Sequence, residues 1–253
     1  MQKIGICIKL AAVSGLSYIR KNPHMALAAL LFLAGIAFLS TKVSTISGAL
    51  FGAGASLLGA WVTELNNRRS NSEDKARRES EARRYLAPEL NRTIERVLYI
   101  HQRAIPTFSS ASIAYAAGEQ IVKPNDLQKD FIPYMPTLYP NAPQFRDLTG
   151  DDATALIAFY DSLHTLDKFV NEWWEREGQL HINIFNMILT YSDESLRFAE
   201  DCIQKFELEK LYPPKYDSWG TLSSRIECSK VSAIQAREYH MARLETKNAK
   251  PAR

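Results

Sequence analysis

The sequence lacks the short motifs by which many enzymes are recognised. It contains no G-x-S-x-G elbow, P-loop, G-x-G-x-x-G turn or H-E-x-x-H segment. Its three cysteines, Cys7, Cys202 and Cys228, have no metal-like spacing. We therefore predict no cofactor and assign no catalytic residue. A tethered enzyme whose site is assembled from distant residues stays open.

The histidines give no better evidence for a metal site. Asp161 and His164 are three positions apart, as in one half of a carboxylate-bridged di-iron site. Such a site needs a second carboxylate–histidine pair and two further glutamates on facing helices. Glu177 and His181, on either side of Gly178, are the closest counterpart in the sequence. We therefore predict that these side chains are polar surface or hydrogen-bonded groups.

Charge is scarce in one region of the chain. Residues 25–63 contain a single charged side chain, Lys42, which separates the apolar segments Met25–Thr41 and Val43–Thr63. As helices these segments would be ~25 and ~31 Å long, against a hydrocarbon core of ~30 Å. The sequence predicts a transmembrane helical hairpin over residues 23–65. A buried hairpin of a soluble protein is the alternative, since the first segment is short.

Basic residues flank this predicted hairpin. Residues 1–69 have a net charge of +6, with Glu64 as their one acidic residue, and the rest of the chain has a net charge of −3. By the positive-inside rule, we expect both termini to face the cytoplasm. From the topology and the short chain, we expect the protein to lie in the inner (plasma) membrane of a bacterial cell. The cysteines would then stay reduced. The negative remainder argues against a nucleic-acid partner, which needs a basic folded domain.

Residues 1–22 precede the hairpin and are predicted to lie at the membrane surface. Apolar residues recur there at helical spacing, as in an amphipathic interfacial helix. A cleaved signal peptide is the alternative. Lys9 interrupts its apolar run, however, and no small-x-small cleavage site precedes the next basic residues.

The second apolar segment has a face of small residues, and this face is our candidate for transmembrane helix packing. Such a stripe lets two helix backbones approach closely, as in GxxxG packing. The face consists of Gly48, Gly52, Ala55, Ser56 and Gly59. Two partners are open, the first span or another subunit, and the second would make a homo-oligomer. A water-filled pore lined by Ser44, Ser47 and Ser56 is the remaining alternative.

Residues 66–105 are predicted to be a basic juxtamembrane stalk followed by the first bundle helix. Asn71 or Ser72 could cap a new helix, and Pro88 should kink or restart it. A basic cluster at the membrane surface consists of Arg68, Arg69, Lys75, Arg77 and Arg78. The cluster either attracts anionic lipid headgroups or belongs to a solvated, salt-bridged stalk, and we favour the stalk.

Residues 106–148 hold six of the eleven prolines, interleaved with aromatic residues. A disordered linker would have fewer aromatics. We predict an ordered, extended connection that packs across the helices, apart from a short helix at Ser110–Ile121. A docking surface for a peptide is the alternative, but the PxxP pattern at Pro133–Pro136 is too common to decide it.

Residues 149–246 are predicted to form three helices, with a polar tail at 247–253. Thr149 and Asp152 have the spacing of a capping arrangement. Apolar residues recur on one face of each helix. Those positions are Leu156, Phe159, Leu163, Leu166, Val170 and Trp173, then Ile184, Ile188, Tyr191, Cys202 and Phe206, then Leu222, Ile226, Ala233 and Ala236. With the helix after the anchor, they would close an antiparallel four-helix bundle.

The sequence therefore predicts an all-α protein, with a transmembrane hairpin that displays a cytoplasmic helical bundle. We expect the bundle to bind an unknown protein partner, as an adaptor or sensor, while the lipid bilayer holds the hairpin. The main alternative is an effector whose spans oligomerise and breach the membrane when the bundle is triggered. A membrane-tethered enzyme is the third possibility.

Overall fold

The computed structural model describes residues 23–39, 44–119, 125–176 and 181–249. All regular elements in these ranges are helical, as predicted, and no strand occurs in them. The chain divides into two compact units, residues 1–76 and 77–253. The interfacial helix predicted for residues 1–22 lies outside the described residues.

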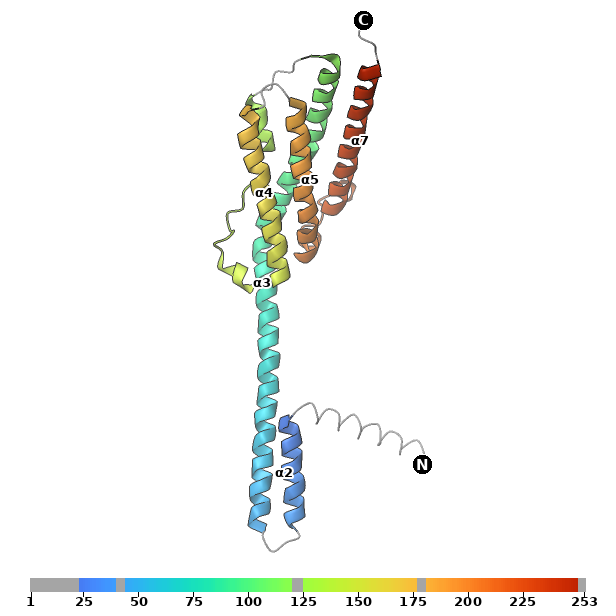
Figure 1. Cartoon of the computed structure of the whole chain (residues 1–253). Helices are drawn as coiled ribbons and strands as arrows, with labels where there is room; N and C mark the ends of the chain where they lie inside the picture. The colour runs from blue at the N-terminus through green and yellow to red at the C-terminus, as the bar shows by residue number, and fades with distance from the viewer. Residues whose placement is uncertain (1–22, 40–43, 120–124, 177–180, 250–253) are drawn as a thin grey trace, which may run out of the picture. The chain divides into compact units, whose positions relative to one another are not determined.

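The first unit contains α2 (Pro23–Leu39) and the beginning of α3 (Ser44–Ala117), labelled in Figure 1. Within the described part of the chain, α3 is the one helix long and apolar enough to cross a membrane. The apolar helix α2 has only 17 residues. The two-span arrangement therefore stays a prediction, with one long and one shorter apolar helix.

The predictions of a new helix at Asn71 or Ser72 and of a restart at Pro88 are wrong, and a kink at Pro88 stays a prediction. The helix α3 continues through both sites and through Pro106. Proline in a helix interior costs about 3 kcal/mol. The fully buried side chains of Leu86 and Leu90 on either side of Pro88 each contribute about 1.5–3 kcal/mol, which offsets that cost.

The C-terminus of α3 explains the separate short helix predicted for Ser110–Ile121. Residues 110–117 are the last two turns of α3. The backbone then turns at Gly118, whose φ of +79° favours glycine, and the N–H of Glu119 donates to the Ala114 carbonyl at 2.9 Å.

The second unit packs the rest of α3 with α4 (Gly150–Arg176), α5 (His181–Lys205) and α7 (Leu222–Ala249). Short helical turns occupy the connections. They are η1 (Asn125–Phe131), η2 (Pro143–Asp147), α6 (Leu208–Leu211) and η3 (Asp217–Trp219). The Thr149 hydroxyl accepts from the Asp152 N–H at 3.1 Å, so the predicted capping arrangement is present.

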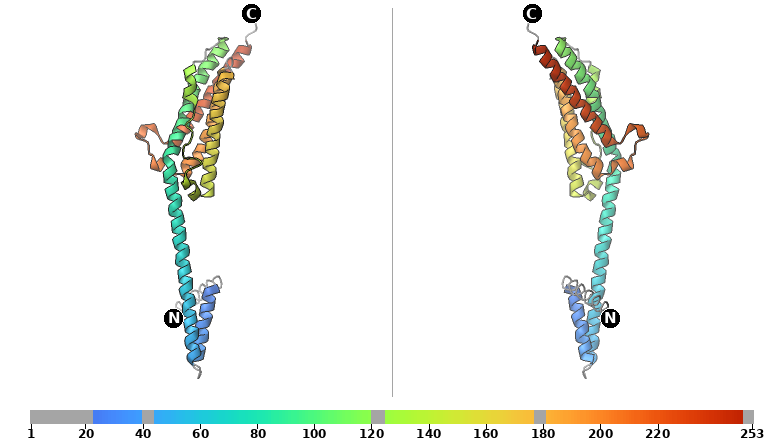
Figure 2. Two further views of the ribbon diagram at one scale, coloured as in Figure 1. Left: turned by 90° about the vertical axis from the view of Figure 1, so that its left-hand side faces the viewer. Right: turned by 90° about the vertical axis from the view of Figure 1, so that its right-hand side faces the viewer.

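The predicted antiparallel bundle is only partly right. Helices α4 and α5 are antiparallel and lie side by side (Figures 1 and 2). Helices α3 and α7 instead run parallel, since residue pairs 95–225, 101–229 and 112–240 are separated by a nearly constant 128 to 130 positions. Helix α4 also runs parallel to α3, because the long connection returns the chain to Arg83, which pairs with Asp152 at 2.8 Å.

The core contains nearly all of the apolar positions predicted from helical periodicity in residues 149–246, together with residues of α3. The side chain of Trp173 lies outside the described residues. Buried side chains from α3 are Leu86, Leu90, Thr93, Val97, Ile100 and Ala104. Those from the later helices are Leu156, Phe159, Leu163, Leu166, Val170, Ile184, Ile188, Cys202, Phe206, Leu222, Ile226, Ala233 and Ala236. Tyr191 is half-buried.

The described part of the connection between α3 and α4, residues 125–149, packs against the bundle, whereas residues 106–117 of the predicted connection belong to α3. Phe131 is fully buried, and its ring centre lies 6.0 Å from that of Trp174 and 5.8 Å from that of Phe185. The Glu89 carboxylate accepts from the Thr137 N–H at 2.9 Å, and Arg96 donates to the Ile132 carbonyl at 3.0 Å. These contacts hold the proline-rich segment against the bundle without a regular helix.

Candidate functional site

Small residues form the contact between α2 and the beginning of α3. The buried positions are Ala28 and Gly35 on α2 and Ser47 and Gly54 on α3. Each pair is seven residues apart, so each lies along one helix face. The Ser47 hydroxyl donates to the Gly35 carbonyl at 2.7 Å, which satisfies the polar group inside the contact.

Two phenylalanines fill the space that these glycines leave. The ring centres of Phe32 and Phe51 are 5.8 Å apart. A Cβ atom placed on Gly54 would lie 3.1 Å from the Phe32 ring, and one on Gly35 would lie 3.3 Å from the Phe51 ring. The two helices are therefore antiparallel and approach too closely for larger side chains at these glycines.

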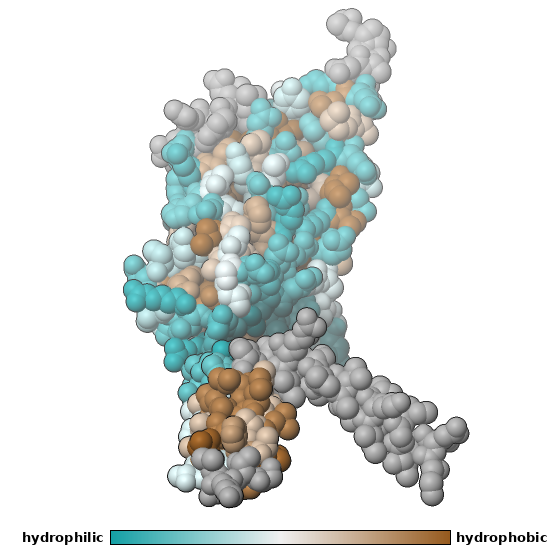
Figure 3. Space-filling view, turned by 60° about the horizontal axis from the view of Figure 1, so that its bottom comes forward, coloured by the Kyte–Doolittle hydropathy of each residue, from teal (hydrophilic) through white to brown (hydrophobic). Residues whose placement is uncertain are grey.

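Large apolar side chains cover the outside of the same hairpin. Leu30 and Leu33 are 64% and 65% exposed. Further exposed positions are Leu27, Ile36, Phe38, Leu39, Ile46 and Val62. Figure 3 shows the apolar surface gathered on these helices, whereas the visible face of the bundle is mostly polar. A contiguous apolar surface of this kind marks a site of contact with lipid or protein.

The predicted packing stripe lies on a different face of α3 from the one that contacts α2. Gly48, Gly52, Ala55, Ser56 and Gly59 are all exposed. No neighbouring atom lies within 4 Å of a Cβ placed on any of its three glycines. Packing of this stripe on the first span is therefore wrong, and packing on another subunit stays a prediction. The periodicity of small residues did not indicate the contact with α2, because the small residues in that contact alternate with phenylalanines along each helix.

The proposed pore lining does not share one helix face either. Ser47 is buried in the contact with α2, whereas Ser56 is exposed. The two positions are nine residues apart, which places them on opposite sides of an α-helix. The side chain of Ser44 lies outside the described residues. Ser47 and Ser56 therefore do not line one channel in this chain.

The basic cluster lies on an exposed part of α3. Arg68, Arg69, Lys75, Arg77 and Arg78 are all exposed. Ion pairs one turn apart join Arg68 to Glu64 at 2.6 Å, Arg69 to Glu73 at 2.8 Å, and Arg77 to Glu81 at 3.9 Å. Exposed pairs of this kind contribute about 0.3–0.5 kcal/mol each. This geometry is typical of the solvated, salt-bridged stalk.

A row of hydrogen-bonded polar side chains, here called the polar seam, joins α3 to α7. His101 on α3 is fully buried, and its Nδ1 lies 2.7 Å from the Ser229 hydroxyl of α7. Its Nε2 has no hydrogen-bond partner among the described residues. Burial lowers the pKa of His101 to about 4, so the imidazole is neutral at neutral pH. Arg225 also donates two hydrogen bonds to Glu95, at 2.7 and 2.8 Å.

The same seam continues toward the C-terminal end of α7. His240 Nδ1 lies 2.9 Å from the Ser112 hydroxyl, which also accepts from Arg243 at 2.8 Å. Burial, and then the positive charge of Arg243, lower the pKa of His240. Lys247 donates to the Tyr115 carbonyl at 2.9 Å. The described part of the predicted polar tail, residues 247–249, therefore belongs to α7 and is bonded to α3 at Lys247.

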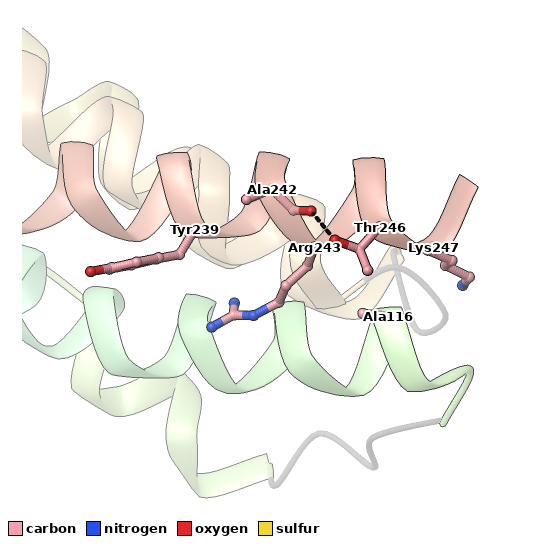
Figure 4. A pocket seen from close by; sticks show the side chains of 6 residues that line it. All are labelled: Ala116, Tyr239, Ala242, Arg243, Thr246 and Lys247. Carbon is pink, nitrogen blue, oxygen red and sulfur yellow. Dashed lines mark hydrogen bonds between the residues drawn. The ribbon is translucent and has the colours of Figure 1, made fainter. Parts of the chain in front are cut away.

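An open groove of about 570 Å³ lies where this seam reaches the surface (Figure 4). Its lining residues are Ala116, Tyr239, Ala242, Arg243, Thr246 and Lys247. Sequence reasoning missed this groove. The parallel pairing of α3 with α7 creates it, and no local pattern in either helix indicates that pairing.

The residues considered for metal and thiol chemistry are not brought together. Asp161 and His164 are exposed on α4, and Glu177 lies outside the described residues. The described residues contain no group of three or more His, Cys, Asp or Glu that could hold a metal ion. Cys202 is buried, and burial raises the pKa of its thiol to about 12, which keeps it protonated and weakly nucleophilic.

The apolar hairpin, the polar seam and the groove are the features of the described residues from which a function can be inferred. None of them depends on a short motif that could be recognised in the sequence. No protein-family model, no curated protein and no solved structure matches this chain.

Proposed function

We propose that this protein is anchored in a lipid bilayer by α2 and the beginning of α3, and that its helical bundle binds a partner as an adaptor or sensor. The observation that carries the anchor is the arrangement of the hairpin, with small residues inside and leucines outside. Exposing a leucine side chain to water costs about 1.5–3 kcal/mol relative to burying it. Lipid removes that cost.

The polar groups of the hairpin support the same proposal. In a bilayer every backbone and side-chain polar group needs an internal partner. Helical hydrogen bonds satisfy the backbone, and the Gly35 carbonyl satisfies the buried Ser47 hydroxyl. Helix α2 is ~25 Å long, somewhat shorter than a hydrocarbon core of ~30 Å. Local bilayer thinning accommodates a difference of this size.

Cysteine labelling in spheroplasts tests the proposed topology. A Lys42→Cys variant should react with a membrane-impermeant maleimide in intact spheroplasts, because Lys42 lies between the two apolar segments. The exposed native Cys228 should react only after lysis and serves as the internal control. The readout is the mass of each labelled peptide. Labelling of Cys228 in intact spheroplasts would contradict the topology.

An exposed aromatic segment supports a binding role for the bundle. Between α5 and α7, Tyr212, Tyr216 and Trp219 are 40%, 52% and 57% exposed. Figure 2 shows this segment projecting from the neighbouring helices of the bundle. Aromatic side chains are enriched in protein interfaces and dominate their energetics.

Photo-crosslinking tests this surface. A crosslinking amino acid at position 219 should capture one defined partner in cells, and a Tyr216→Ala substitution in the same chain should reduce that product. The same probe at Ile157, which is 41% exposed on α4, is the matched control. Equal products from positions 157 and 219 would contradict a specific surface.

The open face of α3 supports a second candidate, an effector that oligomerises through its second span. Gly48, Gly52 and Gly59 are exposed and have room for the backbone of another helix. Induced expression should then depolarise the inner membrane, as measured with a membrane-potential dye. Gly52→Leu should abolish the depolarisation without preventing insertion. Unchanged depolarisation in this variant would contradict assembly through the glycine face.

A further inference from the structure

Two cationic side chains in the groove between α3 and α7 are not neutralised by acidic partners. Arg243 donates to the Ser112 hydroxyl and Lys247 to the Tyr115 carbonyl, and both acceptors are neutral. Neither cation forms an ion pair with a carboxylate within the described ranges of the chain. Elsewhere on α7, Arg225 pairs with Glu95 and Lys230 with Glu200, whereas Arg237 donates to the neutral side chains of Asn186 and Thr190.

The geometry leaves donors on both cations for a ligand. Arginine has five N–H donors in a planar fork and lysine has three. Figure 4 shows the Arg243 side chain reaching from α7 toward α3. The Lys247 ammonium also lies 4.9 Å from the centre of the Tyr115 ring, which helps to hold it at one end of the groove.

The remainder of the groove is suited to an apolar or flat group. Ala116 and Ala242 present methyl groups, and Tyr239 presents a ring that is 65% exposed. The Thr246 hydroxyl already donates to the Ala242 carbonyl at 2.9 Å, so it is not a free donor. The volume of about 570 Å³ lies in the range of small-molecule sites.

We propose that this groove binds a phosphate monoester, with the phosphate held by Arg243 and Lys247 and the rest of the molecule lying against Tyr239. Arginine matches phosphate oxygens through two parallel hydrogen bonds, and lysine adds a compact positive charge. The ligand is either a soluble phosphorylated molecule or the headgroup of an anionic lipid. Binding there gives the bundle a chemical signal to sense, and the site does not depend on the hairpin being in lipid.

Thermal unfolding of the full-length protein in detergent micelles tests the site. The probes are inorganic phosphate, adenosine monophosphate, and mixed micelles that contain phosphatidylcholine with or without phosphatidic acid. A ligand that binds only the native state raises the unfolding midpoint. A rise with either soluble phosphate identifies a soluble ligand, and a rise only with phosphatidic acid identifies a lipid headgroup. No rise with any probe overturns the proposal.

Matched variants show whether a rise in the unfolding midpoint is caused by binding in the groove. Arg243→Gln and Lys247→Gln should each weaken binding by about tenfold or more, since each removes a charge-assisted contact. Arg197→Gln removes the same charge from an exposed position on α5 and should bind like the wild type. Arg243→Gln also loses the bond to Ser112, so Lys247→Gln is the second test. If both Lys247→Gln and Arg243→Gln bind the probe as tightly as the wild type does, the proposed phosphate site is wrong.

Discussion

The hairpin and the bundle bury opposite kinds of side chain. In the hairpin the buried positions are small, such as Gly35 and Gly54, and Leu33 is 65% exposed. In the bundle Leu90 and Phe159 are fully buried. Burial of large apolar groups is what water favours, whereas close packing of small residues is typical of helices that associate in lipid. The contrast is what the proposed anchor predicts, with lipid around the hairpin and water around the bundle.

Charges on the exposed apolar side of the hairpin, which we propose faces lipid, should have the largest effect. Each arginine at the centre of a membrane helix costs about 2.5–3.5 kcal/mol. The double variant Leu30→Arg and Leu33→Arg should therefore leave the membrane fraction, as measured by immunoblotting of sedimented membranes. Leu211→Arg, at an exposed leucine of the bundle, is the control and should stay in the pellet. Equal sedimentation of the double variant and the control would contradict the proposal that lipid surrounds the hairpin and water surrounds the bundle.

A cavity in the bundle should be nearly as costly. Phe159→Ala should lower the free energy of unfolding by about 3–5 kcal/mol, because the side chain is fully buried in the core. Urea unfolding of the full-length protein in micelles, followed by near-UV circular dichroism, measures the change. The neighbouring Ile157 is 41% exposed, and Ile157→Ala should cost much less. Similar losses for both variants would mean that the bundle core is not packed as described.

Acid should weaken the bundle through His101. Its pKa is lowered from 6.5 to about 4, so the unfolded chain takes up a proton at a pH where the folded chain does not. Stability is therefore complete above pH 6.5 and falls as the pH decreases to 4, by about 3 kcal/mol in all.

The His101→Phe variant tests this account in the range between pH 6.5 and 5, above the ordinary range of carboxyl groups. The free energy of unfolding of the wild type should fall there, and that of the variant should fall by about 2 kcal/mol less. Urea unfolding at the two pH values gives both quantities. Parallel losses in the two proteins would show that His101 is not the acid-sensitive group.

Two glycines of α3 separate the packing inside the hairpin from its open face. Gly54→Leu should destabilise the contact with α2 by about 1–3 kcal/mol, since a Cβ there lies 3.1 Å from the Phe32 ring. Gly52→Leu meets no atom within 4 Å and should leave the hairpin intact. Disulfide crosslinking between cysteines introduced at Ala28 and Leu58, which the register of the Phe32–Gly54 and Gly35–Phe51 contacts brings face to face, is compared across both variants and reports the contact. Equal crosslinking in both would contradict the described packing.

Helix faces were largely predictable, because burial follows the 3.6-residue period. Leu156, Phe159 and Leu163 were predicted as core positions and are fully buried. The capping arrangement of Thr149 and Asp152 was also predictable, since it depends on side chains three residues apart. Such features depend on neighbours in the sequence.

Features that depend on tertiary contacts were not predictable. Pro88 predicted a kink or a restart of the helix, but α3 does not restart there, because residues on both sides of Pro88 are buried. The glycine stripe left its partner open between α2 and another subunit, and the contact with α2 is made by Ser47 and Gly54 instead. The groove at Arg243 exists only because α7 returns parallel to α3, across about 130 residues of chain. No local sequence pattern in α3 or α7 indicates that the two helices pair.

The most direct test of the central claim is alkaline extraction of membranes from cells that express the full-length chain. If lipid surrounds the leucines of the hairpin, the protein stays in the pellet after carbonate treatment and is released only by detergent. If it instead remains in the supernatant when a detergent-free lysate is ultracentrifuged, water is the solvent of the hairpin and the proposed anchor is wrong.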